Sequence, residues 1–328
     1  MRATRQKGRD DSRPCRLTAC ATWLGVAMAM FWSAGGSALS WNAVGHRVIA
    51  SIAYDNLTPA ARARADDLIR RHPDYESMFI KDAPADPVQQ AREAFLAASV
   101  WPDQIRNDPR FYDDTQSGAT RQLPGFPDMG RHTNWHYTNT PFTQDGTRGP
   151  DSPRPNVVTE LPRLIEALGK PPGDPSNPVY ALPWFLHLAG DLHNPVHAVA
   201  RFSRELPAGD RGGNLILVGK SQSLHVFWDD LLGSNSSLAY VVPSGRNLVS
   251  EYRAKGPSEP RNGSPAVWAE ESYNLARSGV YTFGKASGSK AKSIVLSSRY
   301  KDKAKQVARR RAVEAGLRIA SILNQKLQ

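Results

Sequence analysis

The spacing of apolar residues predicts a chain made mainly of helices that are joined by long polar loops. Apolar side chains recur at helical spacing within residues 41–57, around 95–100, and within 157–168, 183–193, 224–232, 267–275 and 305–327. Thr58-Pro59 is typical of a helix start, since threonine caps the first turn and proline fits within it. Residues 107–134, 141–156 and 169–178 are rich in turn-forming residues and are predicted to be loops. We expect an all-α fold, a single mainly helical domain with long loops and a minor β-hairpin near residues 215–218.

The first 40 residues have the organisation of an export signal. A basic head runs from Arg2 to Arg16, an apolar run follows from Leu17 to Trp32, and small residues lead to Ser40. An uncleaved membrane anchor is the alternative, because no full charge occurs between Leu17 and Gly45. The apolar run is short for a spanning helix, so we expect residues 1–40 to be a cleaved signal peptide. The mature domain then covers residues 41–328, is exported to the periplasm or the medium, and has no stable membrane association.

Composition narrows the chemistry further. The formal charge of the 328-residue chain is +11, and +7 remains for residues 41–328. A basic body favours polyanionic partners, although such an excess is also common on soluble surfaces. Both cysteines, Cys15 and Cys20, lie in the predicted signal peptide, which excludes a disulfide or a thiolate metal site from the mature chain.

One stretch, from Pro183 to His197, concentrates histidine and aspartate in an otherwise apolar helix. His187 and Asp191 are four residues apart and project from the same face. His197 follows the helix break at Asn194-Pro195, where the chain can turn back towards that face. Burial of such groups is costly unless they are paired or bind a metal. Hydrogen-bonded core histidines and a metal site both remain open at this point, and the same His-x-x-x-Asp spacing recurs at His225 and Asp229.

The remaining motifs, taken in order, resemble those of a known family. They are Trp41…His46, Trp101-Pro-Asp103, Trp135-His136, His187…Asp191…His197 and His225…Asp229. This set is similar to the zinc-dependent, single-strand-specific nucleases of the S1/P1 nuclease family, which are also 3′-nucleotidases. The resemblance, which favours a bacterial-type member, runs from Trp41 to the final helix and includes 212–214 and 268–272. It implies a phospholipase C/nuclease-like fold that holds three zinc ions.

The resemblance also implies which residues hold the three zinc ions. One zinc ion would be held by Asp103, His136, His187 and Asp191. A second would be held by the amino group and carbonyl of a mature Trp41 together with His46, and Asp191 would bridge these two ions. The third would be held by His197, His225 and Asp229, with waters completing the site. Imidazole nitrogen and carboxylate oxygen are both ligands that zinc accepts.

The implied reaction is hydrolysis of single-stranded DNA and RNA to 5′-phosphorylated products, and of 3′-nucleotides. A hydroxide activated by zinc would attack phosphorus in line, and the third zinc would assist the departing 3′-oxygen. Asp103 would orient the hydroxide and Arg106 would stabilise charge in the transition state. A surface salt bridge is the alternative role for Arg106. The resemblance implies no obligate protein partner.

Substrate contacts are expected at three further residues. Tyr137 and Asn139 lie where the family suggests contacts to a nucleobase, which can stack on an aromatic ring only when it is unpaired. Asn214 is a further candidate, because the two glycines before it let a ligand approach the backbone. Each also has a purely structural alternative, as a core ring or as a turn-forming residue. Among the other histidines, we expect His193 to orient a metal ligand, and His72 and His132 to lie in exposed loops.

Two other functions remain possible at this stage. A zinc-dependent phospholipase C would use the same metals. If the chain resembled that branch more closely, we would expect glutamate at the position of Asp229. A non-catalytic exported protein that binds zinc or nucleic acid would be marked by loss of a shared ligand, and the sequence retains all of them.

Overall fold

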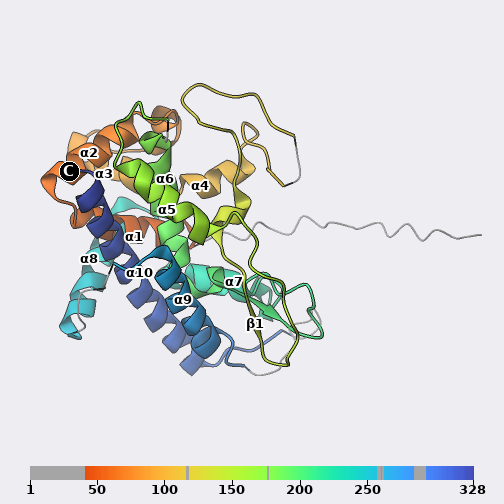
Figure 1. Ribbon diagram of the computed structural model, residues 1–328. Coiled ribbons are helices and arrows are strands. Elements are labelled where there is room, and N and C mark those ends of the chain that lie inside the picture. Colours follow the sequence, from red (N-terminus) through yellow and green to blue (C-terminus); the bar gives the residue numbers. More distant parts are fainter. Residues whose placement is uncertain (1–40, 116–117, 176, 257–259, 261, 284–292) are drawn as a thin grey trace, which may run out of the picture. The chain divides into compact units, whose positions relative to one another are not determined.

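Figure 1 shows a mainly helical chain, in agreement with the fold class that the sequence predicts. The computed structural model describes residues 41–115, 118–175, 177–256, 260, 262–283 and 293–328. The predicted signal peptide therefore lies outside the described residues. Within the described part, no helix combines the length and the apolar character that crossing a membrane requires.

The first part of the chain supplies helices that pack on one another through their apolar faces. It comprises α1 (Ala43–Asp55), α2 (Pro59–Arg70), a π-helical turn (Tyr75–Phe79), α3 (Pro87–Ala98), α4 (Trp101–Gln104) and a 3-10 turn (Ile105–Asn107). Thr58 caps α2, with its side chain accepting a hydrogen bond from the Ala61 amide and Pro59 in the first turn, as the sequence predicts.

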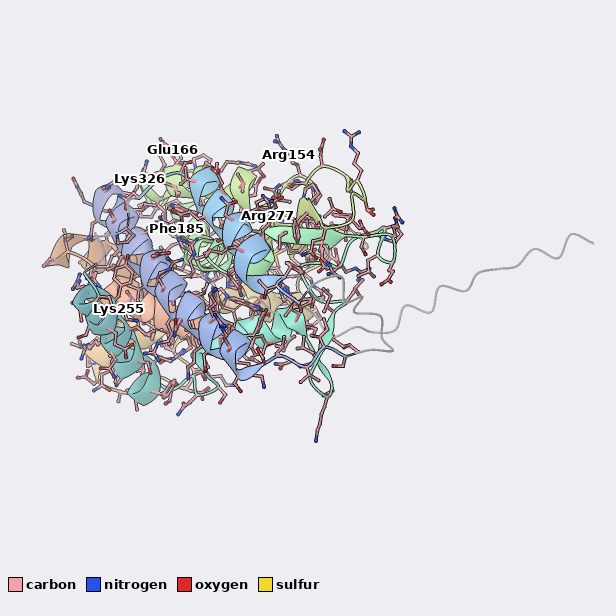
Figure 2. The ribbon with its side chains drawn as sticks, turned by 90° about the horizontal axis from the view of Figure 1, so that it is seen from below. Arg154, Glu166, Phe185, Lys255, Arg277 and Lys326 are labelled. Carbon is pink, nitrogen blue, oxygen red and sulfur yellow. The ribbon has the colours of Figure 1, made fainter. Side chains whose placement is uncertain are left out.

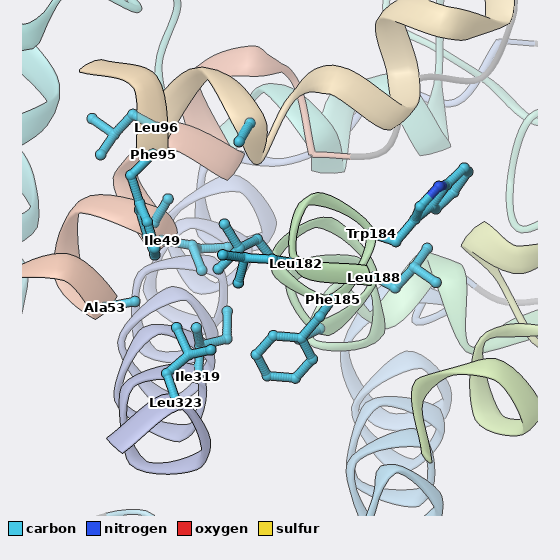
Figure 3. Packing of buried hydrophobic residues seen from close by; sticks show 14 of the residues in the cluster. Ile49, Ala53, Phe95, Leu96, Leu182, Trp184, Phe185, Leu188, Ile319 and Leu323 are labelled. Carbon is cyan, nitrogen blue, oxygen red and sulfur yellow. The ribbon is translucent and has the colours of Figure 1, made fainter. Parts of the chain in front are cut away.

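The central helix is α6 (Pro178–Leu192), and every one of its residues is buried. A helix that is apolar on all sides must be covered on all sides, and α6 contacts helices from both ends of the chain. Figure 3 shows Leu182, Phe185 and Leu188 of α6 within a cluster that also contains side chains of α1, α3 and α10. α5 (Val157–Leu168) packs along α6, preceded by a 3-10 turn (Thr133–His136) and a long loop.

The last part of the chain closes the fold around α6. It comprises α7 (Leu224–Asp229), a 3-10 turn (Asp230–Leu232), α8 (Leu238–Ala254), α9 (Pro265–Leu275), a π-helical turn (Ala276–Val280) and α10 (Ser298–Lys326). α10 approaches α1 very closely at Gly316, where an added Cβ would lie 2.6 Å from Ile52 and 2.9 Å from the Ile49 carbonyl oxygen. Only glycine permits this crossing, which fixes α1 and its His46 relative to the core.

Strands are short in this fold. β3 (Leu217–Val218) and β4 (Gln222–Ser223) form the antiparallel hairpin that the sequence predicts near residues 215–218. A second pair, β1 (Thr140–Thr143) and β2 (Val199–Phe202), is parallel and was not predicted. It joins the segment after His136 to the segment after His197, so it holds two candidate site regions side by side.

The helix predicted around 95–100 ends at Ala98, as the end of α3. Residues 101–106, for which the sequence predicts no helix, form α4 and a 3-10 turn of their own. Pro102 sits in the first turn of α4, a position that proline tolerates because its amide has no helical partner there. As a result, Asp103 and Arg106 are displayed from one short helical segment.

Candidate metal centre

Asp191 lies at the centre of a buried cluster of histidines drawn from three parts of the chain. Its Oδ1 is 3.3 Å from Nε2 of His46 on α1. Its Oδ2 is 3.1 Å from Nδ1 of His136 and 3.3 Å from Nε2 of His187. The two oxygens of one carboxylate thus face two different sets of imidazoles, which is the arrangement of a carboxylate that bridges two cations.

Asp103 completes the second of these sets. Its Oδ1 lies 3.6 Å from Nε2 of His187 and 3.9 Å from Nδ1 of His136. Candidate ligand atoms of Asp103, His136 and His187 all lie within 4.8 Å of one another, as do those of His46, His187 and Asp191. Nε of Arg106 is 3.3 Å from the same Asp103 oxygen, and the arginine side chain is largely buried. Arg106 therefore makes an ion pair at the cluster and not on the outer surface.

A third group lies where the chain turns after α6. Nε2 of His197 is 3.8 Å from Oδ1 of Asp229, and Nε2 of His225 is 3.5 Å from Oδ2. His197 comes from a 3-10 turn (Pro195–His197), whereas His225 and Asp229 are one turn apart on α7. The structure thus gathers every His and Asp residue proposed as a ligand into three buried groups that could hold metal ions.

Backbone carbonyls set the orientation of the histidine rings. Nδ1 of His187, His197 and His225 is 2.8 Å from the carbonyl oxygens of Ser99, His136 and Gly212 respectively. Because a carbonyl can only accept, Nδ1 carries the proton in each neutral ring and Nε2 presents a lone pair to its group. Nε2 of His197 and of His225, and Oδ2 of Asp229, have no hydrogen-bond partner in the described part of the chain.

These buried acceptors provide the test of whether a metal fits. Buried polar atoms without partners are costly in free energy, and three of them converging in one group is hard to explain as core packing. Imidazole nitrogen and carboxylate oxygen, without thiolate, are ligands for zinc. The residues therefore fit a metal centre better than the alternative of a hydrogen-bonded histidine core.

Electrostatics keep most of the histidines neutral. Burial lowers the pKa of His136 to about 3, with Arg106 acting in the same direction. Burial is also the largest cause of the lowered pKa of His46, His197 and His225. A neutral imidazole is the form that binds a metal.

The two central carboxylates differ in their environment. Burial alone would raise the pKa of Asp191, but His187 and His197, with hydrogen bonds from His136 and His187, hold it well below its usual value. Burial raises the pKa of Asp229 well above its usual value, and His225 only partly opposes this. A metal cation beside Asp229 would supply the missing positive charge.

Trp41 is fixed between two of the groups. Its buried indole Nε1 donates to the carbonyl oxygen of Gly190, the residue before Asp191, at 3.0 Å. The next amide, that of Asn42, donates to the carbonyl oxygen of Asp229 at 3.3 Å. The backbone at Trp41 is thereby tied to α6 and to the end of α7, beside residues from both groups.

Asn194 is a functional candidate that the sequence interpretation treated only as part of a helix break. Its fully buried side chain donates from Nδ2 to Oδ1 of Asp229 at 2.8 Å, across 35 residues of sequence. The local sequence held no distinct signal for this contact, because the Asn194 side chain also accepts from the Val196 amide as an ordinary cap of the 3-10 turn. Asn194 orients the Asp229 carboxylate and links it to the end of α6.

The three proposed substrate residues lie in the loops beside these groups. The Tyr137 hydroxyl donates to Asn134 at 2.9 Å, and burial raises the pKa of this tyrosine against the opposing influence of Arg106 and Arg211. Asn139 is half-buried with a left-handed backbone (φ 54°). The Asn214 side chain donates to the carbonyl oxygen of Arg211, within its own turn.

The turn at 209–214 has a clear structural requirement for glycine. Gly212 has φ 63°, and an added Cβ would lie 2.4 Å from the carbonyl oxygen of Val196. This close approach brings the Gly212 carbonyl to Nδ1 of His225. The glycine therefore positions a candidate ligand.

Three histidines differ from their predicted environments. His193 was expected to orient a ligand, but Nδ1 donates to the Ala189 carbonyl and Nε2 accepts from Arg318. His72, expected in an exposed loop, is buried and accepts a hydrogen bond from the Asp74 amide. His132, also expected to be exposed, stacks on Trp135 with ring centroids 3.8 Å apart. The local sequence pattern around each of these histidines did not indicate the partners that surround its ring in the fold.

Comparison with known proteins agrees with this geometry. A family model described as S1/P1 Nuclease matches residues 41–328. The chain is 25% identical over 185 residues to Nuclease S1 of Aspergillus oryzae, covering 52% of this chain and 58% of that protein. It is 28% identical over 160 residues to Endonuclease 3 of Arabidopsis thaliana, covering 44% and 50% respectively. The chain thus spans about half the length of the curated relatives that it matches.

Proposed function

Because the chain belongs to the S1/P1 nuclease family, we propose that it is an exported zinc-dependent endonuclease acting on single-stranded DNA and RNA. Its products would carry 5′-phosphates, and it would also remove phosphate from 3′-nucleotides. The observation that carries this proposal is the placement of Asp191, whose two oxygens face His46 on one side and His136 with His187 on the other.

Three groups of residues would hold three zinc ions. They are Asp103, His136, His187 and Asp191; Trp41, His46 and Asp191; and His197, His225 and Asp229. Zinc bound there would lower the pKa of water and polarise a phosphoryl oxygen. Trp41 would contribute its backbone carbonyl and, after cleavage behind Ser40, its free amino group, so we propose that the mature domain begins at Trp41.

Asp103 and Arg106 would act on the reacting atoms. Hydrolysis forms a bond between the water oxygen and phosphorus and breaks the bond between phosphorus and the 3′-oxygen, which takes up a proton. The Asp103 carboxylate can accept a hydrogen bond from the attacking water and so direct its lone pair. Arg106, held 3.3 Å from Asp103, can stabilise negative charge that develops on the phosphate.

Recognition of an unpaired base would fall to the loops around these groups. Tyr137 offers a ring for stacking, and Asn139 and Asn214 offer amide groups for the edge of the base. In a duplex, both faces of a base are stacked and its pairing edge is hydrogen-bonded. These residues could therefore contact a base only in a single strand.

The chemistry of the products tests this proposal. The mature protein is incubated with end-labelled single-stranded and duplex oligonucleotides, and the new termini are analysed. We expect 5′-phosphate and 3′-hydroxyl ends, faster cleavage of the single strand, and full inhibition by a chelator. New 3′-phosphate ends would reject the mechanism, and turnover of phosphatidylcholine with intact oligonucleotides would assign the protein to the phospholipase C function instead.

A further inference from the structure

The positive charge of the mature chain is concentrated on one short part of its surface. Residues 299–310 contain six lysines or arginines and one aspartate, a net charge of +5, whereas residues 41–328 as a whole carry +7. These residues form the first half of α10. Most of the excess positive charge therefore lies on about three turns of one helix.

Arg299 and Lys303 are one turn apart on one flank of the buried side, and Lys301 and Lys305 are one turn apart on the opposite flank of α10. Its inward side carries Ala304 and Ala308, which are buried, and Tyr300, which is half-buried. Arg299, Lys301, Lys303 and Lys305 are all exposed, and we call these four residues the α10 basic face. None of the four forms an ion pair within the described part of the chain, although Arg309 and Arg310 pair with Glu251 and Glu314. The basic face is thus not neutralised by its surroundings.

A groove adjoins the basic face on the side of α8. Its volume is about 900 Å³, and its lining has a net positive charge, with five lysines or arginines (among them Lys255, Lys303 and Lys305) against the carboxylates of Glu251, Asp302 and Glu314, beside the ring of Tyr252. Lys255 directly follows α8 and is labelled in Figure 2. A positively charged groove that also contains an aromatic ring has the composition of surfaces that bind single-stranded nucleic acid without sequence preference.

The basic face is also connected to the candidate metal centre. The Tyr300 hydroxyl accepts a hydrogen bond from Nε1 of Trp228 at 3.0 Å, and Trp228 directly precedes Asp229 on α7. Ala304 and Val307 pack in the same apolar cluster as Trp228. The first half of α10 is therefore packed directly on the helix that carries His225 and Asp229.

We propose that the α10 basic face and its groove form a second binding surface, which holds the phosphodiester backbone of a long single-stranded substrate away from the bond being cleaved. The inference rests on the proposed nuclease function and extends it to substrate length. The four residues of the basic face cover about 9 Å along the helix axis, and their long side chains extend beyond both flanks. An extended single strand lying over the helix can therefore bring several phosphates within reach of these cations. The proposal predicts that a dinucleotide, which fills only the metal centre, makes no contact with this surface.

The test compares two variants that remove equal charge from different places. The test variant replaces Arg299, Lys301, Lys303 and Lys305 with glutamine. The control variant replaces Arg70, Arg71, Lys81 and Arg163, four exposed cations outside α10, with glutamine. All positions are exposed, and equal thermal unfolding midpoints verify that both variants fold.

Kinetics on short and long substrates measure the predicted effect. For a 30-nucleotide thymidylate, we expect the test variant to raise KM about tenfold at low salt, while kcat and KM for a dinucleotide stay within twofold of the wild type. Each lost phosphate contact lowers the slope of log affinity against log salt by about 0.7, so four contacts lower it by about 3. The control variant should keep the wild-type slope.

A binding arm separates this inference from the nuclease proposal. Anisotropy of a labelled 30-nucleotide phosphorothioate strand is measured with the same three proteins. Salt-sensitive binding that only the test variant loses would support the surface even if no cleavage occurred. Normal cleavage with unchanged KM and salt slope in the test variant would overturn it, as would equal losses in both variants. Unchanged oligonucleotide binding with lost binding to phosphatidylglycerol vesicles would assign the surface to lipid instead.

Discussion

At the scale of single residues, Asn194 holds the Asp229 carboxylate of the third candidate metal group. Replacing Asn194 with alanine removes the hydrogen bond to Asp229 Oδ1 and leaves that carboxylate free to turn. Loss of such a partner typically weakens metal affinity by about 10- to 100-fold. We expect one metal ion per chain to be lost at lower chelator concentration than in the wild type, measured by metal content during a chelator titration.

Two comparisons make the Asn194 result specific. Asn194→Asp keeps the size of the side chain but places a second carboxylate against Asp229, so it should also lose metal early. Asn274→Ala, in an exposed position of α9, should behave as the wild type. If Asn194→Ala retained all its metal at every chelator concentration, the asparagine would not position Asp229.

His72 makes stability depend on pH. Burial lowers the pKa of His72 to about 4 from its usual 6.5, so the unfolded chain binds this proton more readily than the folded one. The contribution is fully present above pH 6.5 and is lost as the pH falls from about 6.5 to about 4, in total about 3 kcal/mol. His72→Asn keeps an acceptor for the Asp74 amide but does not titrate.

The pH prediction is measured by urea unfolding of both proteins at pH 7.5 and pH 4.5. The wild type should lose about 2 to 3 kcal/mol more than His72→Asn between the two values. Equal losses in the two proteins would mean that His72 is protonated without cost in the folded state.

The individual histidines also show how far the sequence alone can predict a site. His187 with Asp191, and His225 with Asp229, are predictable because helical geometry fixes partners four residues apart. Asn194 and the carbonyls of Ser99 and Gly212 are not, because their contacts cross 35, 88 and 13 residues. Tertiary packing, and not local spacing, decides which side chains orient the ligands.

At the scale of helices, a buried charge network joins α6, α9 and α10. Glu271 on α9 accepts hydrogen bonds from Arg311 and Arg318 of α10, whose side chains are almost fully buried. Arg311 donates in turn to the carbonyl oxygen of His193, and Ser272 donates to that of Leu192. The network therefore satisfies the last carbonyls of the helix that carries His187 and Asp191.

Glu271→Gln should be strongly destabilising. It removes the negative charge that Arg318 and Arg311 share, leaving Arg311 with Glu314, and weakening charged hydrogen bonds of this kind costs about 1.5 to 3 kcal/mol. Urea unfolding of Glu271→Gln and of Glu270→Gln, its exposed neighbour on α9, checks this directly. A loss below about 1 kcal/mol would indicate that the arginines are hydrated in the folded state.

Helices were predictable from the sequence where apolar periodicity is long, as in α1, α6 and α10. α4 was not, because four residues are too few to show a period and Pro102 reads as a stop. The parallel pair β1 and β2 was also not predictable, since each strand is only four residues long and its partner is 59 residues away. Pairing at such distances depends on the helices that bring the two segments together.

At the scale of the whole molecule, the described residues combine an acidic and imidazole-rich centre with a basic, exposed first half of α10. The centre contains the candidate ligands of all three groups, with Asp191 facing two sets of histidines. The α10 basic face carries most of the net charge of residues 41–328. A polyanion would thus be attracted over a broad surface and cleaved at one place. This division predicts that the rate of cleavage depends on bound metal, whereas the affinity for long strands depends on the salt concentration.

The most direct test of this account is hydrolysis of single-stranded DNA and RNA by the protein beginning at Trp41, with and without chelator, beside Asp191→Asn. Because Asp191 serves two groups, Asp191→Asn should abolish cleavage and lower the metal content. The wild type should cleave until the chelator is added. Full activity of Asp191→Asn, or cleavage by the wild type that a chelator leaves unchanged, would contradict a metal-dependent nuclease built on this carboxylate.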